Sequence, residues 1–179
     1  MTGAPDAGVG RAFIEESRRQ LTEDHLPRIE RCVEKLTEDE TWWRPSAESN
    51  SVGNLLLHLA GNLRQWVVSG VGGERDQRAR QAEFDERGPL PSGLTLAKLQ
   101  ASVTDADRVL STADPVTLLT ERRVQGRDVT GLYAIYHAVE HFSMHTGQII
   151  LLTKMRKGDL GFYDLSGGVP KPQWRRPTD

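Results

Sequence analysis

The segment YHAVEHFSMHTGQI, residues 136–149, contains three of the chain's five histidines: His137, His141 and His145. They lie four residues apart, and a step of four moves a side chain only about 40° around an α-helix. In this otherwise apolar stretch, the spacing predicts a helix with the three imidazoles on one stripe. Imidazoles at positions i and i+4 can converge on one metal ion, as they do in HExxH helices. The glutamate of that motif is missing, because Glu140 directly precedes His141.

Four segments of the chain have apolar residues at helical spacing. We expect helices over residues 11–36, 52–68, 95–110 and 129–155. Pro27 should kink or divide the first helix, because proline lacks the N–H that a helix interior needs. Asn50 or Ser51 is the expected N-cap of the second helix, and Asp128 is a candidate N-cap of the fourth.

Long connections separate these helices. Residues 74–93 are highly charged, and we expect a loop or a short helix there; residues 112–131 form a second connection. No stretch shows sustained strand alternation. The expected fold class is therefore all-α, a four-helix bundle with long connections. The length suits a single domain spanning 1–179, with a core over about residues 11–163 and an irregular, glycine- and proline-rich tail over residues 164–179.

The composition argues against several functional classes. Lys and Arg number 23 against 25 Asp and Glu, for a net charge of -2, so no nucleic-acid footprint is expected. The single cysteine, Cys32, cannot form an intramolecular disulfide and is expected in the core. The N-terminal residues lack a basic region followed by an apolar run, and no apolar stretch approaches the ~20 residues that span a bilayer. We therefore expect a cytoplasmic protein without membrane contacts.

His58 lies in LLLHLAGN, residues 55–62, an almost wholly apolar stretch of the second helix. A buried imidazole needs a partner, and a hydrogen bond in the core would suffice. The register of the other histidines favours another hypothesis, in which His58 faces His141 and His145 across the bundle and the three hold one divalent cation. Three neutral imidazoles suit Zn²⁺, Ni²⁺, Cu²⁺ or Fe²⁺, and three ligands leave a position open for water or substrate. His137 is a fourth ligand, a core residue or, as we expect, a support for the ligands.

Further polar residues can shape a pocket near the predicted centre. Asn62 lies one turn after His58 and either hydrogen-bonds a ligand or supports the bundle; Gln148 is a weaker candidate. His25 is expected to be structural or partly exposed. Three charged residues of the 74–93 connection can cover a pocket and hold an anionic substrate, although we expect a solvated charged loop: Arg78, Arg80 and Glu83.

The segments LLLHLAGNLRQW and EHFSMHTGQI together resemble the DinB/YfiT-like superfamily, and the resemblance extends over about residues 13–163. It implies a small four-helix bundle with a three-histidine metal site, carried here by His58, His141 and His145. His137 is additional to that triad. The segments NSVGNLLLHLAGNLRQW, AEF and HTGQIILLTKM are similar to a bacterial branch without a settled function.

The same resemblance implies classes of activity. The first is a metal-dependent transferase that joins a low-molecular-weight thiol, such as bacillithiol or mycothiol, to a small electrophile, with Zn²⁺ or Ni²⁺ as the expected metal. The alternatives are a metal-dependent hydrolase and a non-enzymatic, stress-related binding protein with a structural metal. A homodimer is also expected by resemblance. Nothing in the residues supports DNA binding.

Overall fold

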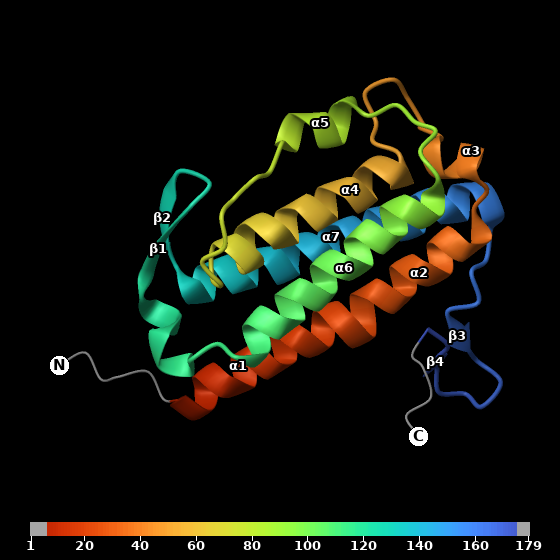
Figure 1. The fold of residues 1–179 in the computed structure, drawn as a ribbon. Helices are drawn as coiled ribbons and strands as arrows, with labels where there is room; N and C mark the ends of the chain where they lie inside the picture. Colours follow the sequence, from red (N-terminus) through yellow and green to blue (C-terminus); the bar gives the residue numbers. More distant parts are fainter. Residues whose placement is uncertain (1–6, 175–179) are drawn as a thin grey trace.

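The computed structural model describes residues 7–174, and helical rods lie side by side along its length (Figure 1). The long rods are α1 (Ala7–Arg19) with the π-helical turn η1 (Gln20–His25) and α2 (Leu26–Lys35); α4 (Val52–Leu63) with the π-helical turn η2 (Arg64–Ser69); α6 (Ser92–Ser111); and α7 (Gly131–Lys157). The shorter helical elements are α3 (Glu38–Trp42), α5 (Arg80–Asp85) and the 3-10 turn η3 (Pro115–Leu119). The expected four-helix bundle is confirmed.

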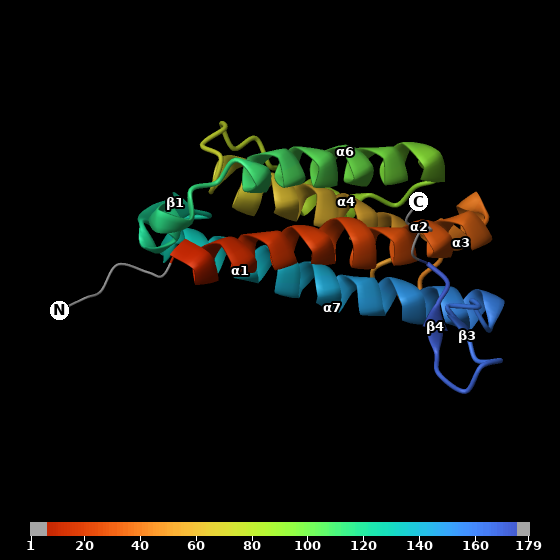
Figure 2. The same ribbon diagram turned by 90° about the horizontal axis from the view of Figure 1, so that it is seen from below.

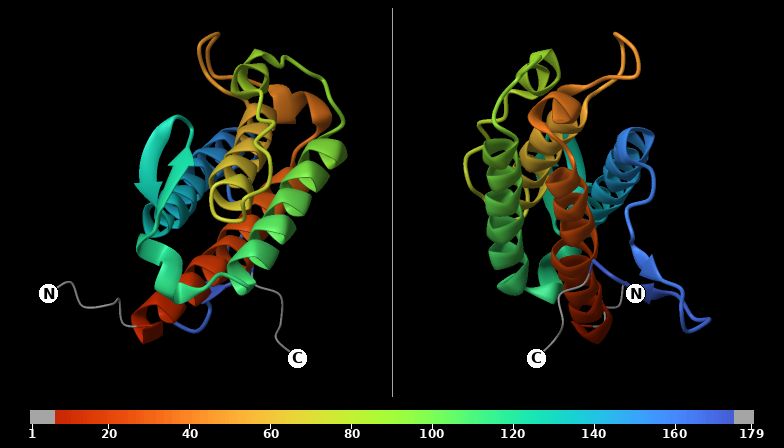
Figure 3. Two further views of the ribbon diagram at one scale, coloured as in Figure 1. Left: turned by 60° about the vertical axis from the view of Figure 1, so that its left-hand side comes forward. Right: turned by 90° about the vertical axis from the view of Figure 1, so that its right-hand side faces the viewer.

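The directions of the rods explain why the connection between α4 and α6 is long. In Figure 1, α4 and α6 run in the same direction, whereas the α1–α2 rod and α7 run the opposite way. Two parallel neighbours need a connection that returns along the bundle, so residues 70–91 cross back over α4 and carry α5 with them (Figures 1 and 3). Of the two alternatives for this connection, the short helix is correct. We call residues 70–91 the crossover.

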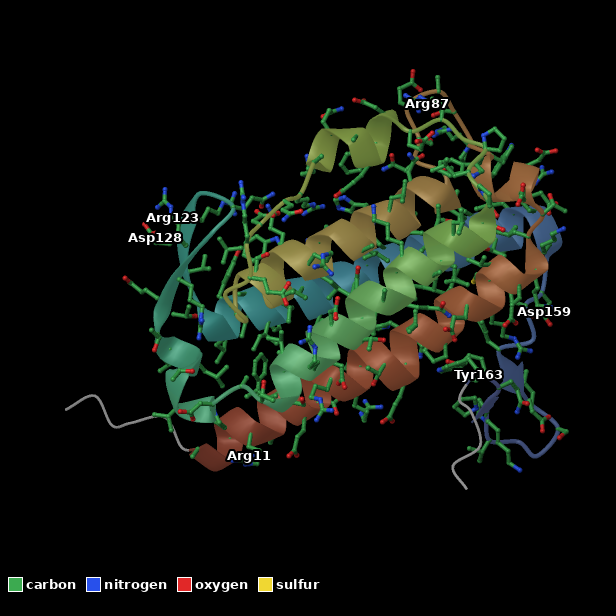
Figure 4. The ribbon with its side chains drawn as sticks, in the orientation of Figure 1. Arg11, Arg87, Arg123, Asp128, Asp159 and Tyr163 are labelled. Atoms are coloured by element: carbon green, nitrogen blue, oxygen red, sulfur yellow. The ribbon has the colours of Figure 1, made fainter. Side chains whose placement is uncertain are left out.

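The starts of α4 and α7 follow ordinary capping chemistry, with one correction. Ser51 caps α4 and forms a capping box with Asn54, as one of the two candidates predicted. At α7 the prediction of Asp128 is wrong, because the Thr130 hydroxyl accepts the Tyr133 N–H at 3.1 Å. Asp128 instead belongs to a strand and pairs with Arg123 at 2.7 Å, and both side chains lie on the outer edge of the molecule (Figure 4).

Pro27 divides the first rod, as expected. The α-helical hydrogen-bonding pattern is replaced by π-helical turns over residues 20–25, and Pro27 then occupies the first turn of α2. A proline is tolerated there because the N–H that it lacks would have no partner in an ideal first turn. The rod nevertheless continues along one direction (Figure 2). The first helix is therefore divided by helix type into α1, η1 and α2, which remain one continuous rod.

Short strands occur where none was expected. β1 (Glu121–Val124) pairs antiparallel with β2 (Arg127–Thr130), and β3 (Tyr163–Asp164) pairs with β4 (Lys171–Pro172). Gln125 and Gly126 both have positive φ, 52° and 77°, which suits a two-residue hairpin turn. The tail is therefore not wholly irregular: Trp174 is buried and lies under the Arg28 guanidinium. Residues 175–179 of the predicted tail lie outside the described residues.

The core is apolar and lies between the rods. Its fully buried large side chains include Trp66, Leu59, Ile135 and Phe142. Cys32 is buried among them, as expected, and burial raises the pKa of its thiol to about 11. No helix in residues 7–174 combines the length and hydrophobicity that crossing a bilayer requires.

Candidate metal centre

Three histidines meet where α4 packs against α7. His58 comes from α4, and His141 and His145 come from successive turns of α7. Their ring centroids are 5.0 Å apart for His58–His141, 5.0 Å for His58–His145 and 4.4 Å for His141–His145. Each residue offers one ligand nitrogen, and these nitrogens lie within 4.8 Å of one another. The helix pairing thus brings together the residues that the sequence grouped.

The facing nitrogens of this cluster lack ordinary partners. Nε2 of His58 lies 2.8 Å from Nε2 of His141. Two imidazole lone pairs this close repel each other unless a proton or a cation lies between them. Nε2 of His145 is buried and has no hydrogen-bond partner within the described residues. A buried polar atom without a partner is costly, so this arrangement fits a site built to hold a cation.

The opposite nitrogens of two rings are fixed by acceptors. Nδ1 of His58 lies 2.9 Å from Oε2 of Glu83, and Nδ1 of His145 lies 2.7 Å from Oε1 of Gln148. The Arg78 guanidinium is also 3.1 Å from Nδ1 of His58, but an ionised carboxylate can only accept, so Nδ1–H donates to Glu83. Both rings then present an unprotonated Nε2. Metal-binding histidines are usually held in this way by a second group.

The electrostatics favour neutral rings at His141 and His145. Burial, together with the nearby His145 and His58, lowers the pKa of His141 to about 3. Burial also lowers the pKa of His145, although the hydrogen bond to Gln148 opposes it. Neutral imidazole is the form that binds a metal, and an all-nitrogen donor set suits divalent transition metals better than Mg²⁺ or Ca²⁺. The residues present therefore fit such an ion.

A buried ion pair from the crossover packs against this cluster. Arg78 donates from Nε to Oε1 of Glu83 and from Nη2 to Oε2, both at 2.8 Å. The side chains are only 3% and 12% exposed, so the expectation of a solvated loop is wrong for both residues. Arg80 lies over the ring of Phe84 at 4.9 Å, and Phe84 itself packs on His58. Sequence reasoning did not identify Glu83 as a partner of His58.

Gly61 makes room for this ion pair. A Cβ at residue 61 would collide with the Glu83 carboxylate and lie 3.0 Å from Nε of Arg78. Glycine in a helix interior is unfavourable by about 1 kcal/mol relative to alanine, so its presence in α4 has a structural reason. A glycine in the helix interior, one turn from His58, is the signal in the sequence that another segment packs closely against α4 there.

The model of one protein family, described as a protein of unknown function (DUF1572), matches residues 8–166. This chain belongs to the DUF1572 family. The fold is also similar to the crystal structure of a DinB-like protein from Bacillus cereus ATCC 10987, with a TM-score of 0.56 and 15% identity over 73% of this chain and 85% of that chain. The predicted relationship to the DinB-like superfamily is confirmed. Comparison with curated proteins gave no match.

The structure also places the other predicted residues of the DUF1572 protein. The centroid of the His137 ring lies 4.1 Å from that of Trp66, with the rings tilted, and 5.4 Å from that of His141, with the rings stacked. His137 lies outside the group of three ligand nitrogens. Asn62 is buried one turn along α4 from His58, and its role stays a prediction. His25 was expected to be structural or partly exposed. It is buried, so the expectation of partial exposure is wrong.

The crossover of the DUF1572 protein also borders a partly open cavity of about 660 Å³ against α4 and α6. Arg78 and Glu83 line it, together with Leu57, Gly61 and Leu90, but the three histidines do not. The Arg78–Glu83 pair therefore touches the cavity on one side and His58 on the other.

Proposed function

We propose that this DUF1572 protein binds one divalent transition metal, Zn²⁺ or Ni²⁺, through His58, His141 and His145, and that the centre is catalytic. The observation that carries the proposal is the convergence of one ring nitrogen from each of the three histidines, with Nδ1 of His58 and Nδ1 of His145 already engaged elsewhere. Three protein ligands leave a coordination position open, which is the arrangement of catalytic rather than closed structural sites.

The reaction we propose is transfer of a low-molecular-weight thiol to a small electrophile. The metal would favour the thiolate over the thiol, because thiolate is both the nucleophile and the better ligand. The sulfur forms a bond to the electrophilic carbon, the leaving group departs with its bonding electron pair, and the thiol proton passes to solvent. The burial of His58 and His145 excludes water around the ligands, and Glu83 and Gln148 orient these two rings. The choice of a thiol rests on the likeness to DinB/YfiT-like proteins.

The metal content of protein purified without a nickel column tests the centre. About one transition metal per chain in the wild type, lost in His141→Ala, supports it; wild-type protein that is metal-free and fails to bind added Zn²⁺ or Ni²⁺ refutes it. Loaded protein is then assayed for thiol consumption with bacillithiol or mycothiol and model electrophiles. Turnover of esters or amides without thiol would identify a hydrolase. A large loss of melting temperature on chelation, without any turnover, would identify a structural metal.

We also propose that the protein acts on a small molecule as a homodimer. Support for a dimer comes from exposed apolar side chains along α7, each about half or more exposed: Tyr136, Met144, Leu151 and Met155. Light scattering of the wild type and of Leu151→Glu with Met155→Glu tests this. A dimer that the paired substitution dissociates supports the proposal, and a monomeric wild type refutes it.

A further inference from the structure

Among the contacts that hold the crossover to the bundle near α5, two separate sets involve Glu83. The first set fixes its backbone: Nδ2 of Asn54 donates to the carbonyl oxygens of Glu83 and Glu86, at 2.8 and 2.9 Å. The second set is the Glu83 side chain, whose Oε2 accepts from His58 and whose two oxygens pair with Arg78. Loss of the carboxylate would therefore leave the backbone of α5 docked while freeing the ring of His58.

The carboxylate is ionised where it lies. Burial opposes ionisation, but the hydrogen bonds from Arg78 and His58 outweigh it and lower the pKa of Glu83. An anion that accepts from Nδ1–H makes Nε2 of the same ring a better electron donor and offsets part of the charge of a bound cation. Asn54 cannot replace this effect, because it contacts only the backbone of Glu83.

We propose that Glu83 is a positioning residue of the metal centre and that metal binding couples to the docking of the crossover. The inference rests on the proposed metal centre and deepens it. If the docked carboxylate raises the affinity for the metal by some factor, the bound metal stabilises docking by the same factor, because such coupling is reciprocal. The crossover is then part of the metal centre rather than a linker, and the centre is complete only when the crossover is docked against α4.

Three variants separate this role from general loosening of α5. Glu83→Ala removes the acceptor and the charge. Glu83→Gln preserves the side-chain shape and one acceptor oxygen, and keeps the test decisive if the alanine variant is unstable. Asp85→Ala is the matched control, since Asp85 is on the same short helix, is exposed and hydrogen-bonds only to Gln81 among the described residues.

The measurements are the Zn²⁺ affinity by competition with a chromophoric chelator, the visible spectrum with Co²⁺, and hydrogen exchange of residues 70–91 with and without Zn²⁺. Glu83→Ala should lower the Zn²⁺ affinity by about 10–100-fold with one metal still bound, and should change the Co²⁺ spectrum. Glu83→Gln should lie between that variant and the wild type, and Asp85→Ala should match the wild type. Zn²⁺ should slow exchange of the crossover in the wild type and much less in Glu83→Ala.

The possible failures are distinct. If Glu83→Ala binds Zn²⁺ as tightly as the wild type, the positioning role is wrong and the three-histidine centre stands. If Asp85→Ala loses as much affinity as Glu83→Ala, general loosening of α5 explains the loss and the inference also fails. If the wild type binds neither Zn²⁺ nor Co²⁺, both the centre and the role of Glu83 are wrong.

Discussion

Replacement of Gly61 by alanine tests the packing beneath the crossover without altering any polar group. The new Cβ would occupy the place of the Glu83 carboxylate and lie 2.9 Å from its Cδ. A flexible carboxylate could ordinarily swing aside, but this one is held by Arg78 at 2.8 Å and by His58 at 2.9 Å. Its displacement therefore breaks the buried ion pair and leaves Arg78 without its anionic partner.

The expected magnitude is the difference between two opposing effects on the free energy of unfolding. Alanine in place of glycine stabilises a helix interior by about 1 kcal/mol. Breaking a buried ion pair destabilises by about 3–5 kcal/mol, and the value should lie near the lower end because the pair borders an open cavity. The net loss is about 2 kcal/mol, which lowers the melting temperature of a domain of this size by roughly 4–8 °C.

Thermal unfolding of metal-free protein, followed by circular dichroism, measures the effect. Gly147→Ala is the matched control: Gly147 lies within α7, and a Cβ there meets nothing within 4 Å. This control should raise the melting temperature by about 2–4 °C, because only the helix propensity changes. If Gly61→Ala is as stable as the wild type or more so, the Arg78–Glu83 pair is not packed tightly against Gly61 of α4, and the reasoning is wrong.

Further substitutions probe the site, the core and the helix start. His145→Ala should abolish Zn²⁺ binding in a chelator competition, whereas His137→Ala should retain one metal per chain, since its ring lies outside the ligand group. Cys32 should resist iodoacetamide at pH 8 in the folded protein and react once urea unfolds it, because burial raises its pKa to about 11 and little thiolate forms; rapid labelling of native protein would contradict this. Thr130→Ala should lower the free energy of unfolding by about 0.5–2 kcal/mol, by loss of the α7 cap, whereas Asp128→Ala should change it little.

The four rods were predictable because each has its own local signal. Apolar residues at helical spacing located them to within a few residues, and Ser51 was a recognisable cap. The β1–β2 hairpin had no such signal, since Val124 and Val129 are the only aliphatic side chains of its strands and only Val124 is buried. Its turn, Gln125-Gly126, also differs from the usual Asn-Gly. Asp128 was mistaken for a cap because the hairpin continues to Thr130 and places the start of α7 directly after it.

The three-histidine cluster and the carboxylate that contacts it differ in the same way. His58, His141 and His145 were predictable because each sits in a helix whose apolar residues fix the side of the bundle that it faces. Glu83 was not, because the crossover has no periodicity and its path depends on α4 and α6 running parallel. The signal in the sequence that points to Glu83 is Gly61, in the helix α4 that Glu83 contacts. Glycine in a helix interior is about 1 kcal/mol less favourable than alanine. A helix that contains glycine there must therefore gain more than this from the space that the missing Cβ leaves. Here that space is filled by a carboxylate that holds His58.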